Sequence, residues 1–557
     1  MGISFKKHKK DLLFVPLGGA GQIGMNLNLY QLDGKWLMVD FGAGFAEDYF
    51  PGVDMIVPDI SFIKERKDDL QGLVLTHAHE DHLGAIVHLW HEFGCPIYAT
   101  PFTAAFLRAK ISDNPHIGHA KIIEVEPGSK FKVGNFELEM VGLTHSVPEM
   151  NAVVLNTPYG NIFHSGDWKL DPNPMLGPAS DEEKIKKYGD KGIYAIVGDS
   201  TNSLSPGYSG SEGDLRNSLI DLVAGCKKLV IVTTFASNVA RIETIAKAAE
   251  AAGRRVILVG RSLWRISSAA KESGYLKDVP PFLEASEFKK FSRDKVLVIA
   301  TGCQGEPLAG MSKITTGNNR DIKIATGDSV IFSSKIIPGN DKRLFRMFNK
   351  LVEQGAELLT EKDHFVHVSG HPNQEEMKKL YGMLKPQYSI PVHGEIVHMK
   401  EHAKLAKSWG VKKSFNVVNG DVLRLAPGEP EKLGEVQASE MAVDGNFILP
   451  PDDPILKARR KMQREGVVFV TLIMGKNELK TAPIVYAPGL LDDEKDVEII
   501  LAIKEEIAHS IYEYQNNKHK KKQSEHTMLN NIRAAVRRIV KPETGKNPPI
   551  VIHIEKM

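Results

Sequence analysis

The segment Thr-His-Ala-His-Glu-Asp-His at residues 76–82 restricts the fold and chemistry of this chain more than any other part of the sequence. A short apolar run, residues 72–75, precedes it, and an amphipathic stretch, residues 83–89, follows it. The apolar run favours a strand and the amphipathic stretch favours a helix. The sequence therefore predicts a strand, a loop and a helix, with the polar side chains gathered in the loop.

The side chains of this loop have the chemistry of metal ligands. Imidazole nitrogens and carboxylate oxygens both suit zinc or a similar divalent ion. His77 and His79 can reach one ion, and Asp81 and His82, at the expected start of the helix, can reach a second. A histidine-rich surface loop is the alternative, but so many ligands at usable spacing favour a metal site. A structural zinc ion is closed by four ligands, whereas two ions that share a site create an activated water.

Three more residues of ligand type end strand-like apolar runs elsewhere in the chain: His145, Asp167 and His393. Loops at strand ends are where layered α/β proteins gather such residues. Asp40 also ends an apolar run, and it fits a residue that accepts a hydrogen bond from a ligand imidazole. Each of these alone could be an ordinary polar residue at a strand end. Together they supply the ligands that a two-ion site needs.

In this order, these residues resemble the metallo-β-lactamase superfamily. Three later segments resemble the additional motifs of the β-CASP nucleases, and two more narrow the resemblance to the bacterial ribonuclease J family. The segments are Gly198-Asp199-Ser200-Thr201, His367-Val368-Ser369-Gly370-His371 and Pro391-Val392-His393-Gly394-Glu395 for the β-CASP nucleases, and residues 233–238 and 301–307 for ribonuclease J. The resemblance runs nearly end to end. One departure is Gln22, where the family pattern leads us to expect a glutamate.

The chain order predicts a domain inserted within another. With 557 residues the chain is too long for one core, so two to four domains are expected. Apolar runs at 229–232, 255–259 and 295–299, with helical stretches between them, predict a parallel sheet covered on both faces. Because His393 then returns a ligand to the first domain, the middle piece must be an insertion.

The resemblance implies an α/β fold class for the whole chain. It implies a discontinuous metallo-β-lactamase αββα sandwich, an inserted β-CASP α/β domain, a linker and a small C-terminal α+β domain. The boundaries that we assign are 1–204 with 376–427, 205–375, 428–460 and 461–557. In the last part we expect a strand at 467–472, helices at about 492–517 and 525–540, and a strand at 550–554. In the family a comparable C-terminal domain supports oligomerisation, so a homodimer or homotetramer is expected.

The resemblance also implies two divalent ions per chain, most simply zinc, with manganese or magnesium as alternatives. It assigns His77, His79, His145 and Asp167 to one ion, and Asp81, His82, Asp167 and His393 to the other, so that Asp167 bridges them. Two such ions polarise the scissile phosphate and activate the attacking water. His371 is the candidate acid for the leaving 3′ oxygen, and Asp199 or Asp81 would orient the water or exchange protons with it. A phosphate-binding role for His371 without proton transfer stays open.

The resemblance further implies a pocket for a nucleotide phosphate. Its residues would be His367, Val368, Ser369, Gly370 and His371, with Phe235, Ala236 and Ser237 beside the substrate. The hydroxyl of Ser369 and the N–H of Gly370 can donate to phosphate oxygens. Phe235 could stack on a base, although a phenylalanine after a buried strand is as often part of the core. The expected substrate is single-stranded RNA with a 5′-monophosphate, cut by 5′-to-3′ exonuclease and endonuclease activity in rRNA maturation and mRNA decay, with RNA-decay proteins as partners.

Composition indicates a cytoplasmic enzyme without a membrane segment. No apolar run approaches the roughly 20 residues needed to cross a bilayer. The basic start of the chain lacks the apolar segment and cleavage site of a signal peptide. Cys95, Cys226 and Cys303 are odd in number and far apart, which argues against a disulfide framework or a cysteine zinc site. A net charge of +2 is too small to establish a polyanion partner by itself.

Three other functions compete with a ribonuclease. A thioester hydrolase of the glyoxalase II kind shares the metal motif but has no use for the inserted domain. A di-iron oxidoreductase of the same superfamily would be expected to carry a carboxylate where His79 stands. A non-hydrolytic scaffold that binds RNA would have lost ligands, and none is missing here.

Several other patterns are weaker. Residues 19–24 match the dinucleotide pattern G-x-G-x-x-G, but the alternation after them predicts a strand where that motif needs a helix. His398 and His402 have zincin spacing, but Met399 stands where that motif needs glutamate, so a solvated helix face is expected. The basic run 518–522 could contact RNA or form a solvated turn, and the same ambiguity holds for Arg533, Arg537 and Arg538.

Overall fold

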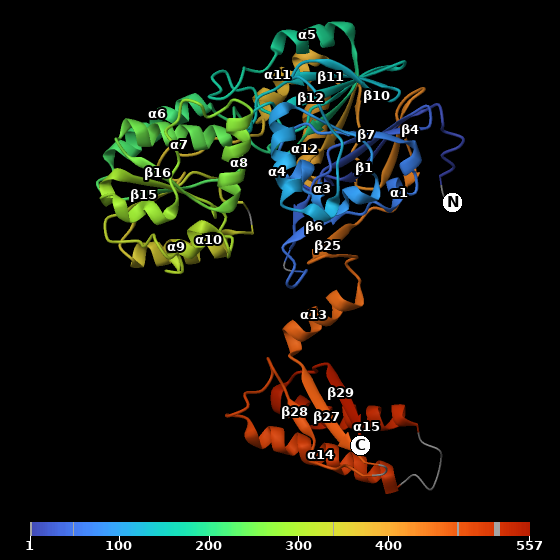
Figure 1. Cartoon of the computed structure of the whole chain (residues 1–557). Coiled ribbons are helices and arrows are strands. Elements are labelled where there is room, and N and C mark those ends of the chain that lie inside the picture. The colour runs from blue at the N-terminus through green and yellow to red at the C-terminus, as the bar shows by residue number, and fades with distance from the viewer. Residues whose placement is uncertain (1–2, 48, 338, 476–477, 517–523) are drawn as a thin grey trace. The chain divides into compact units, whose positions relative to one another are not determined.

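The computed structural model describes residues 3–47, 49–337, 339–475, 478–516 and 524–557 (Figure 1). Its contacts divide the chain into two units, residues 1–44 with 57–439 and residues 45–56 with 440–557. The first unit holds two large sheets and an inserted smaller sheet, and the second holds a small α+β fold. The predicted α/β class with an inserted domain is therefore confirmed.

The first unit is built on two mixed sheets packed face to face. The first has the strand order β24 (Glu431–Glu435), β23 (Asp421–Ala426), β1 (Leu12–Gly18), β3 (Leu27–Leu32), β4 (Lys35–Val39), β7 (Leu70–Val74), β8 (Ile97–Ala99) and β9 (Ile122–Glu124). The second has the order β10 (Lys130–Val133), β11 (Phe136–Gly142), β12 (Asn151–Thr157), β13 (Gly160–His164), β14 (Ile193–Asp199), β20 (Tyr388–Val392) and β22 (Lys413–Ser414).

One apolar core joins the inner faces of the two sheets. Phe14 and Val39 from the first sheet belong to the same buried cluster as Met140, Val153 and Val197 from the second. The outer face of the second sheet is covered by α5 (Glu182–Lys191), α11 (Gln374–Leu384) and α12 (Ile396–Ser408), which share a second cluster with it. Because both faces of this sheet are covered, β14 and β20 are almost entirely buried and read as continuous apolar runs.

The inserted domain is a five-stranded sheet. Its order is β16 (Arg255–Val259), β17 (Val296–Ala300), β15 (Val230–Thr233), β18 (Ser329–Phe332) and β19 (Glu357–Leu359), and all of its pairings are parallel. Figure 1 shows α6 (Glu212–Gly225) and α7 (Val239–Ala251) on one side of it, and α9 (Gly310–Thr315) and α10 (Asp341–Glu353) on the other. The chain leaves the sandwich after β14 and returns as β20, its neighbour in the sheet. The predicted parallel sheet and its insertion are confirmed.

The glycine-rich segment 19–24 does not lead into a helix. It is followed by β3, which pairs with β1 and β4, as the alternating sequence predicts. A dinucleotide fingerprint needs a helix whose N-terminus faces the pyrophosphate. This segment therefore does not form a dinucleotide site of that kind.

The second unit contains a three-stranded sheet with the order β28 (Ile484–Tyr486), β27 (Val468–Met474) and β29 (Ile550–Lys556). Two helices, α14 (Val497–Asn516) and α15 (Glu525–Thr544), bury their apolar faces against it. These elements match the strands and helices expected from the sequence. Residues 428–460, expected as a linker, include β24, β25 (Glu440–Asp444), β26 (Phe447–Leu449) and the start of α13 (Pro454–Glu465).

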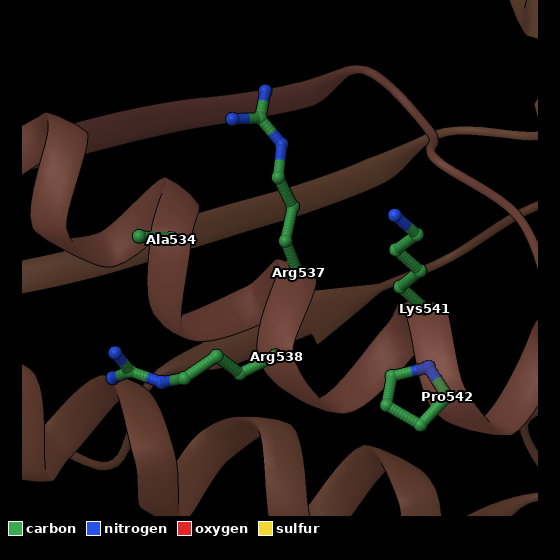
Figure 2. A pocket seen from close by; sticks show the side chains of 5 residues that line it. All are labelled: Ala534, Arg537, Arg538, Lys541 and Pro542. Atoms are coloured by element: carbon green, nitrogen blue, oxygen red, sulfur yellow. The ribbon is translucent and has the colours of Figure 1, made fainter.

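The basic residues of α15 differ in their surroundings. Arg538 pairs with Glu506 of α14, with its Nη2 atom 2.6 Å from Oε1. Arg537 and Lys541 project from the same side of the helix beside a shallow hollow that Ala534 and Pro542 also line (Figure 2). The basic run 518–522 lies outside the described residues. Within those residues, the structure contains no helix both long and apolar enough to span a membrane.

Candidate metal centre

The histidine-rich loop lies between β7 and the short helix α2 (Glu80–Leu83), as predicted. Its backbone is held by neighbouring loops, because Phe41 N–H donates to the carbonyl of His82 over 2.7 Å and Asn26 N–H donates to that of Asp81 over 2.9 Å. Lys110, on helix α4 (Pro101–Ser112), lies 2.5 Å from the Glu80 carboxylate and fixes the outer side of the loop. The loop is thus held rigidly against the end of the sheet.

The structure brings all seven expected ligands together. They form two groups whose ligand atoms all lie within 4.8 Å of one another: His77, His79, His145 and Asp167, and Asp81, His82, Asp167 and His393. Asp167 belongs to both groups. Its Oδ2 atom is 3.1 Å from Nε2 of His82, 3.4 Å from that of His393 and 3.8 Å from that of His77. This carboxylate oxygen therefore lies within reach of ligand atoms from both groups.

Four of the five histidines are anchored through Nδ1, which leaves Nε2 for the centre. Nδ1 of His77 lies 2.9 Å from Thr76 Oγ1, and Nδ1 of His82 lies 2.7 Å from Asp40 Oδ2. Nδ1 of His145 lies 2.6 Å from the Gly370 carbonyl oxygen, and Nδ1 of His393 lies 3.0 Å from Asn26 Oδ1. In His79 the ring is reversed, because Nε2 faces Ser146 Oγ and Nδ1 faces the ring of His145, each at 3.2 Å. Such partners fix the orientation and tautomer of ligand imidazoles.

Asp40 contacts the imidazole of His82, as an orienting residue would. Besides His82, its carboxylate accepts hydrogen bonds from the N–H of Thr76 at 2.8 Å and from the Thr76 hydroxyl. Asp40 and His393 both adopt positive φ angles, 61° and 49°, which non-glycine residues rarely do. Such backbone costs on the order of 1–3 kcal/mol per residue and persists where the surrounding contacts enforce it.

The site has the properties of a cation site. His77 Nε2 and Asp167 Oδ1 are buried and have no hydrogen-bond partner among the described residues. Burial lowers the pKa of His77 and of His145, and lowers that of His79 to about 4, so these imidazoles are neutral. Burial would raise the pKa of Asp167, but His393, His82 and His371 outweigh it and hold the carboxylate ionised. Burial would also lower the pKa of His82, but Asp167, Asp81 and Asp40 outweigh it and raise that pKa, so His82 must release its proton on binding a divalent metal, whereas His77, His79 and His145 already have the neutral form that binds one.

The candidate acid and its partner lie at the edge of this cluster. Nδ1 of His371 is 2.8 Å from Oδ2 of Asp199, and the His371 ring is 5.1 Å from that of His145 and 5.6 Å from that of His393. Burial lowers the pKa of His371, but Asp199, then Asp167, raise it to about 9. Ligand atoms of Asp167, Asp199, His371 and His393 also lie within 4.8 Å of one another. The geometry therefore permits both a proton-donating and a ligand role for His371.

The segment 367–371 is fixed from two sides. Arg241 of α7, fully buried, pairs bidentately with Glu212 of α6, and its guanidinium also donates to the carbonyls of Val366 and Val368 over 3.4 Å. At the other end, Gly370 abuts His145, and a side chain there would begin 2.8 Å from its Cε1 atom. The position therefore requires glycine.

Phe235, Ala236 and Ser237 form the turn between β15 and α7 and are half-buried. The N–H of Asn238 donates back to the carbonyl of Phe235, and the Asn238 side chain caps the helix that carries Arg241. The turn and the segment 366–368 are thus attached to the same end of α7. His367 is half-buried, with Nδ1 unpaired within the described part of the chain, and Val368 is buried.

The sequence suggested Asp40 as a partner of a ligand imidazole but not Asn26 or Thr76, which contact His393 and His77. It also gave no signal for Asn202 and Arg241, because the segment that they contact is distant in sequence. The solvated face predicted for His398 and His402 is wrong for His402, which is 1% exposed. Its ring contacts Ser200 Oγ at 2.9 Å and Tyr381 O–H at 2.8 Å, because α12 turns this face towards the sandwich.

Comparison with protein families gives four matches along the chain. A beta-lactamase superfamily domain matches residues 50–182, and the ribonuclease J beta-CASP domain matches residues 227–351. A Zn-dependent metallo-hydrolase RNA specificity domain matches residues 356–418, and the ribonuclease J C-terminal domain matches residues 454–557.

Similar proteins cover the chain almost completely. Ribonuclease J of Sinorhizobium meliloti is 39% identical over 556 residues, 98% of this chain and 98% of that protein. Ribonuclease J of Thermus thermophilus is 34% identical and covers 97% of this chain and 94% of its own length. A crystal structure of a protein of unknown function from Enterococcus faecalis V583 matches 70% of this chain and 95% of its own, with a TM-score of 0.51 and 18% identity, and so supports the fold alone.

Proposed function

Because the chain belongs to the ribonuclease J family and is a metal-dependent ribonuclease, we propose that it degrades single-stranded RNA from the 5′ end and also cuts it internally. The observation that carries the proposal is Asp167, whose carboxylate is shared by two groups of ligand atoms. A hydrolase that acts on a phosphodiester needs charge at the phosphate and a proton for the leaving oxygen. The ligand groups around the Asp167 carboxylate could hold cations that supply the charge, and His371 beside them could supply the proton.

The residues present fit two divalent ions, most simply zinc. One would be held by His77, His79, His145 and Asp167, and the other by Asp81, His82, Asp167 and His393. Bound there, the ions would supply positive charge to the phosphate and lower the pKa of water. The chain's own contribution is to hold the imidazoles in one orientation through Thr76, Asp40, Asn26 and the Gly370 carbonyl.

His371 would donate the proton that the 3′ oxygen needs to leave. Its Nδ1 atom is engaged by Asp199, so Nε2 is the nitrogen available to the substrate. The Asp199 carboxylate favours the protonated imidazole and keeps the ring oriented. Asp199 or Asp81 would accept the proton of the attacking water. In this scheme water adds to phosphorus, the bond to the 3′ oxygen breaks, and one proton passes from His371 to that oxygen.

The segment 367–371 would hold the terminal phosphate of the RNA. The Ser369 hydroxyl and the Gly370 N–H can donate to its oxygens, and Phe235, Ala236 and Ser237 would line the path of the adjoining nucleotides. A pocket sized for one phosphate leaves a triphosphate with unpaired negative charge, so a 5′-monophosphate is preferred. The resemblance of the segment around His393 to the family motif implies RNA, not DNA, as the substrate.

The C-terminal domain, residues 461–557, would join copies of the chain into a homodimer or homotetramer. In support, the face of its sheet opposite α14 and α15 exposes large apolar side chains, with Phe469 paired across strands to Tyr486 and to Val551. We include three further points in the same proposal. They are the domain boundaries at residues 204, 375, 427 and 460, association with RNA-decay proteins, and action in rRNA maturation and mRNA decay.

The test uses RNAs of one sequence, labelled internally and carrying a 5′-monophosphate, a 5′-triphosphate or a 5′-hydroxyl. We expect nucleoside monophosphates to be released fastest from the monophosphorylated RNA. A circular RNA of the same sequence should be cut only internally, and the corresponding DNA should be a poor substrate. Equal rates on all three RNAs would show that the segment 367–371 does not select the 5′ end. The protein would then be an endonuclease without that preference.

A further inference from the structure

Asn202 contacts the phosphate-pocket segment directly. It follows β14 and Asp199, while the segment that it contacts lies 167 residues later in the chain. Its Nδ2 atom donates to Ser369 Oγ at 2.8 Å, to the carbonyl of His371 at 3.1 Å and to Asn373 Oδ1 at 3.1 Å. Asn202 therefore limits the hydrogen bonds that the Ser369 hydroxyl can form.

The orientation of the Asn202 amide is fixed by its neighbours. The carbonyl of His371 can only accept, so the atom facing it must be the nitrogen. Asn373 is fixed in the same way, since its Nδ2 atom faces the carbonyls of Pro206 at 3.3 Å and Tyr208 at 3.1 Å and its oxygen is left towards Asn202. Two independent acceptors thus place the amide nitrogen, which cannot accept a hydrogen bond, beside the Ser369 hydroxyl, with its two N–H bonds shared among Ser369, the His371 carbonyl and Asn373.

The other neighbour of the Ser369 hydroxyl is also a donor. The backbone N–H of His371 donates to Ser369 Oγ over 3.1 Å. A hydroxyl oxygen has two lone pairs and one proton, and here the two groups that face it, the Asn202 amide nitrogen and the His371 N–H, can donate to it but cannot accept its proton. Among the residues that the structure describes, the Ser369 hydroxyl donates to no protein atom. Its proton is thus free for a ligand.

We propose that Asn202 is a positioning residue that makes the Ser369 hydroxyl an obligate donor and thereby sets the preference for a 5′-monophosphate. This deepens the proposed function and rests on it. Ser369 lies next to Gly370, whose carbonyl holds His145, and two residues before His371. A Ser369 hydroxyl held in this way already points its proton away from Asn202 and the His371 N–H. Its hydrogen bonds therefore need not rearrange when a phosphate binds.

The substitution Asn202→Asp tests the direction of this hydrogen bond. Aspartate has nearly the same shape as asparagine but can only accept when ionised, so the Ser369 proton would turn towards it and away from the phosphate. Asn202→Ala removes the donor without replacing it, so the hydroxyl would rotate freely. The preference, measured as the rate on 5′-monophosphorylated RNA divided by the rate on 5′-hydroxyl RNA, should fall in the order wild type, Asn202→Ala, Asn202→Asp.

A hydrogen bond to a charged group contributes enough for a roughly 10-fold or larger effect on this ratio. Ser369→Ala should lower the ratio by that amount, and Asn202→Asp should lower it about as much. The double variant Asn202→Asp/Ser369→Ala should be no lower than Ser369→Ala, because Asn202 acts through Ser369. Using a ratio removes any general loss of catalysis, and melting temperature and bound zinc verify the fold of each variant.

Each result decides between the two proposals. If Ser369→Ala lowers the ratio but Asn202→Asp does not, the positioning role is wrong and the pocket stands. If Asn202→Asp lowers the ratio equally in the presence and absence of the Ser369 hydroxyl, Asn202 acts by another route and the proposal is again wrong. A wild-type ratio of one would overturn both the pocket and the role of Asn202.

Discussion

Replacing Gly370 by alanine should weaken metal binding although Gly370 contributes no side chain to the site. A Cβ atom at this position would lie 2.8 Å from Cε1 and 3.0 Å from Nδ1 of His145, and ordinary contacts begin at 3.4 Å. The two groups must therefore separate by about 0.6 Å. His145 is 8% exposed and has little room to move.

This separation would lengthen the hydrogen bond between His145 and the Gly370 carbonyl. The distance between Nδ1 of His145 and the Gly370 carbonyl is 2.6 Å, and a shift of about 0.6 Å along it would bring it to the upper end of the usual range. The same shift moves the His145 ring away from the ion position, and perturbing an orienting partner in this way typically costs about 10–100-fold in metal affinity or activity. That range corresponds to about 1.4–2.8 kcal/mol.

Competition with a chromophoric chelator measures the zinc affinity, and RNA hydrolysis is followed at limiting and at saturating zinc. We expect a 10–100-fold weaker affinity in Gly370→Ala, with an activity deficit that shrinks as zinc is raised. Gly382→Ala is the matched control, since a Cβ there meets nothing within 4 Å and lies on an exposed face of α11. Wild-type zinc affinity in Gly370→Ala would refute the view that this contact positions His145.

Three further substitutions test separate parts of the site. His371→Ala should retain bound zinc and lose roughly 10²–10⁴-fold in cleavage rate, and a fall in zinc content would make His371 a ligand instead. Asp40→Asn should lower zinc affinity roughly 10–100-fold in the same chelator assay, and unchanged affinity would deny Asp40 its orienting role. Arg241→Met should lower the free energy of unfolding by about 3–5 kcal/mol in urea titrations, because it leaves the Glu212 carboxylate buried without its partner, and a loss below 1 kcal/mol would contradict this.

The candidate ligands could be predicted from sequence because most of them follow strand-like runs. The strands β7, β11 and β13, which precede His77, His145 and Asp167, end at the same side of the sandwich, so these residues converge although they are far apart in the chain. The inserted sheet could be predicted for a similar reason, since strands covered on both faces appear as continuous apolar runs.

The residues that hold the segment 366–371 could not be predicted in this way. Asn202 and Arg241 act on a segment more than 120 residues away, and neither has a local pattern that indicates a partner. His402 shows the opposite error, because spacing along a helix shows that two residues share a face but not whether that face is buried. Only the packing of α12 against the sandwich decides this.

We propose that the Asp167 carboxylate serves two ions that together support RNA hydrolysis. The most direct measurement is the number of divalent ions per chain, by elemental analysis of wild type and Asp167→Ala, with RNA cleavage measured on the same samples. We expect about two ions in the wild type, one or none in Asp167→Ala, and loss of hydrolysis with the fold retained by circular dichroism. Near-normal cleavage with both ions retained in Asp167→Ala would contradict the account.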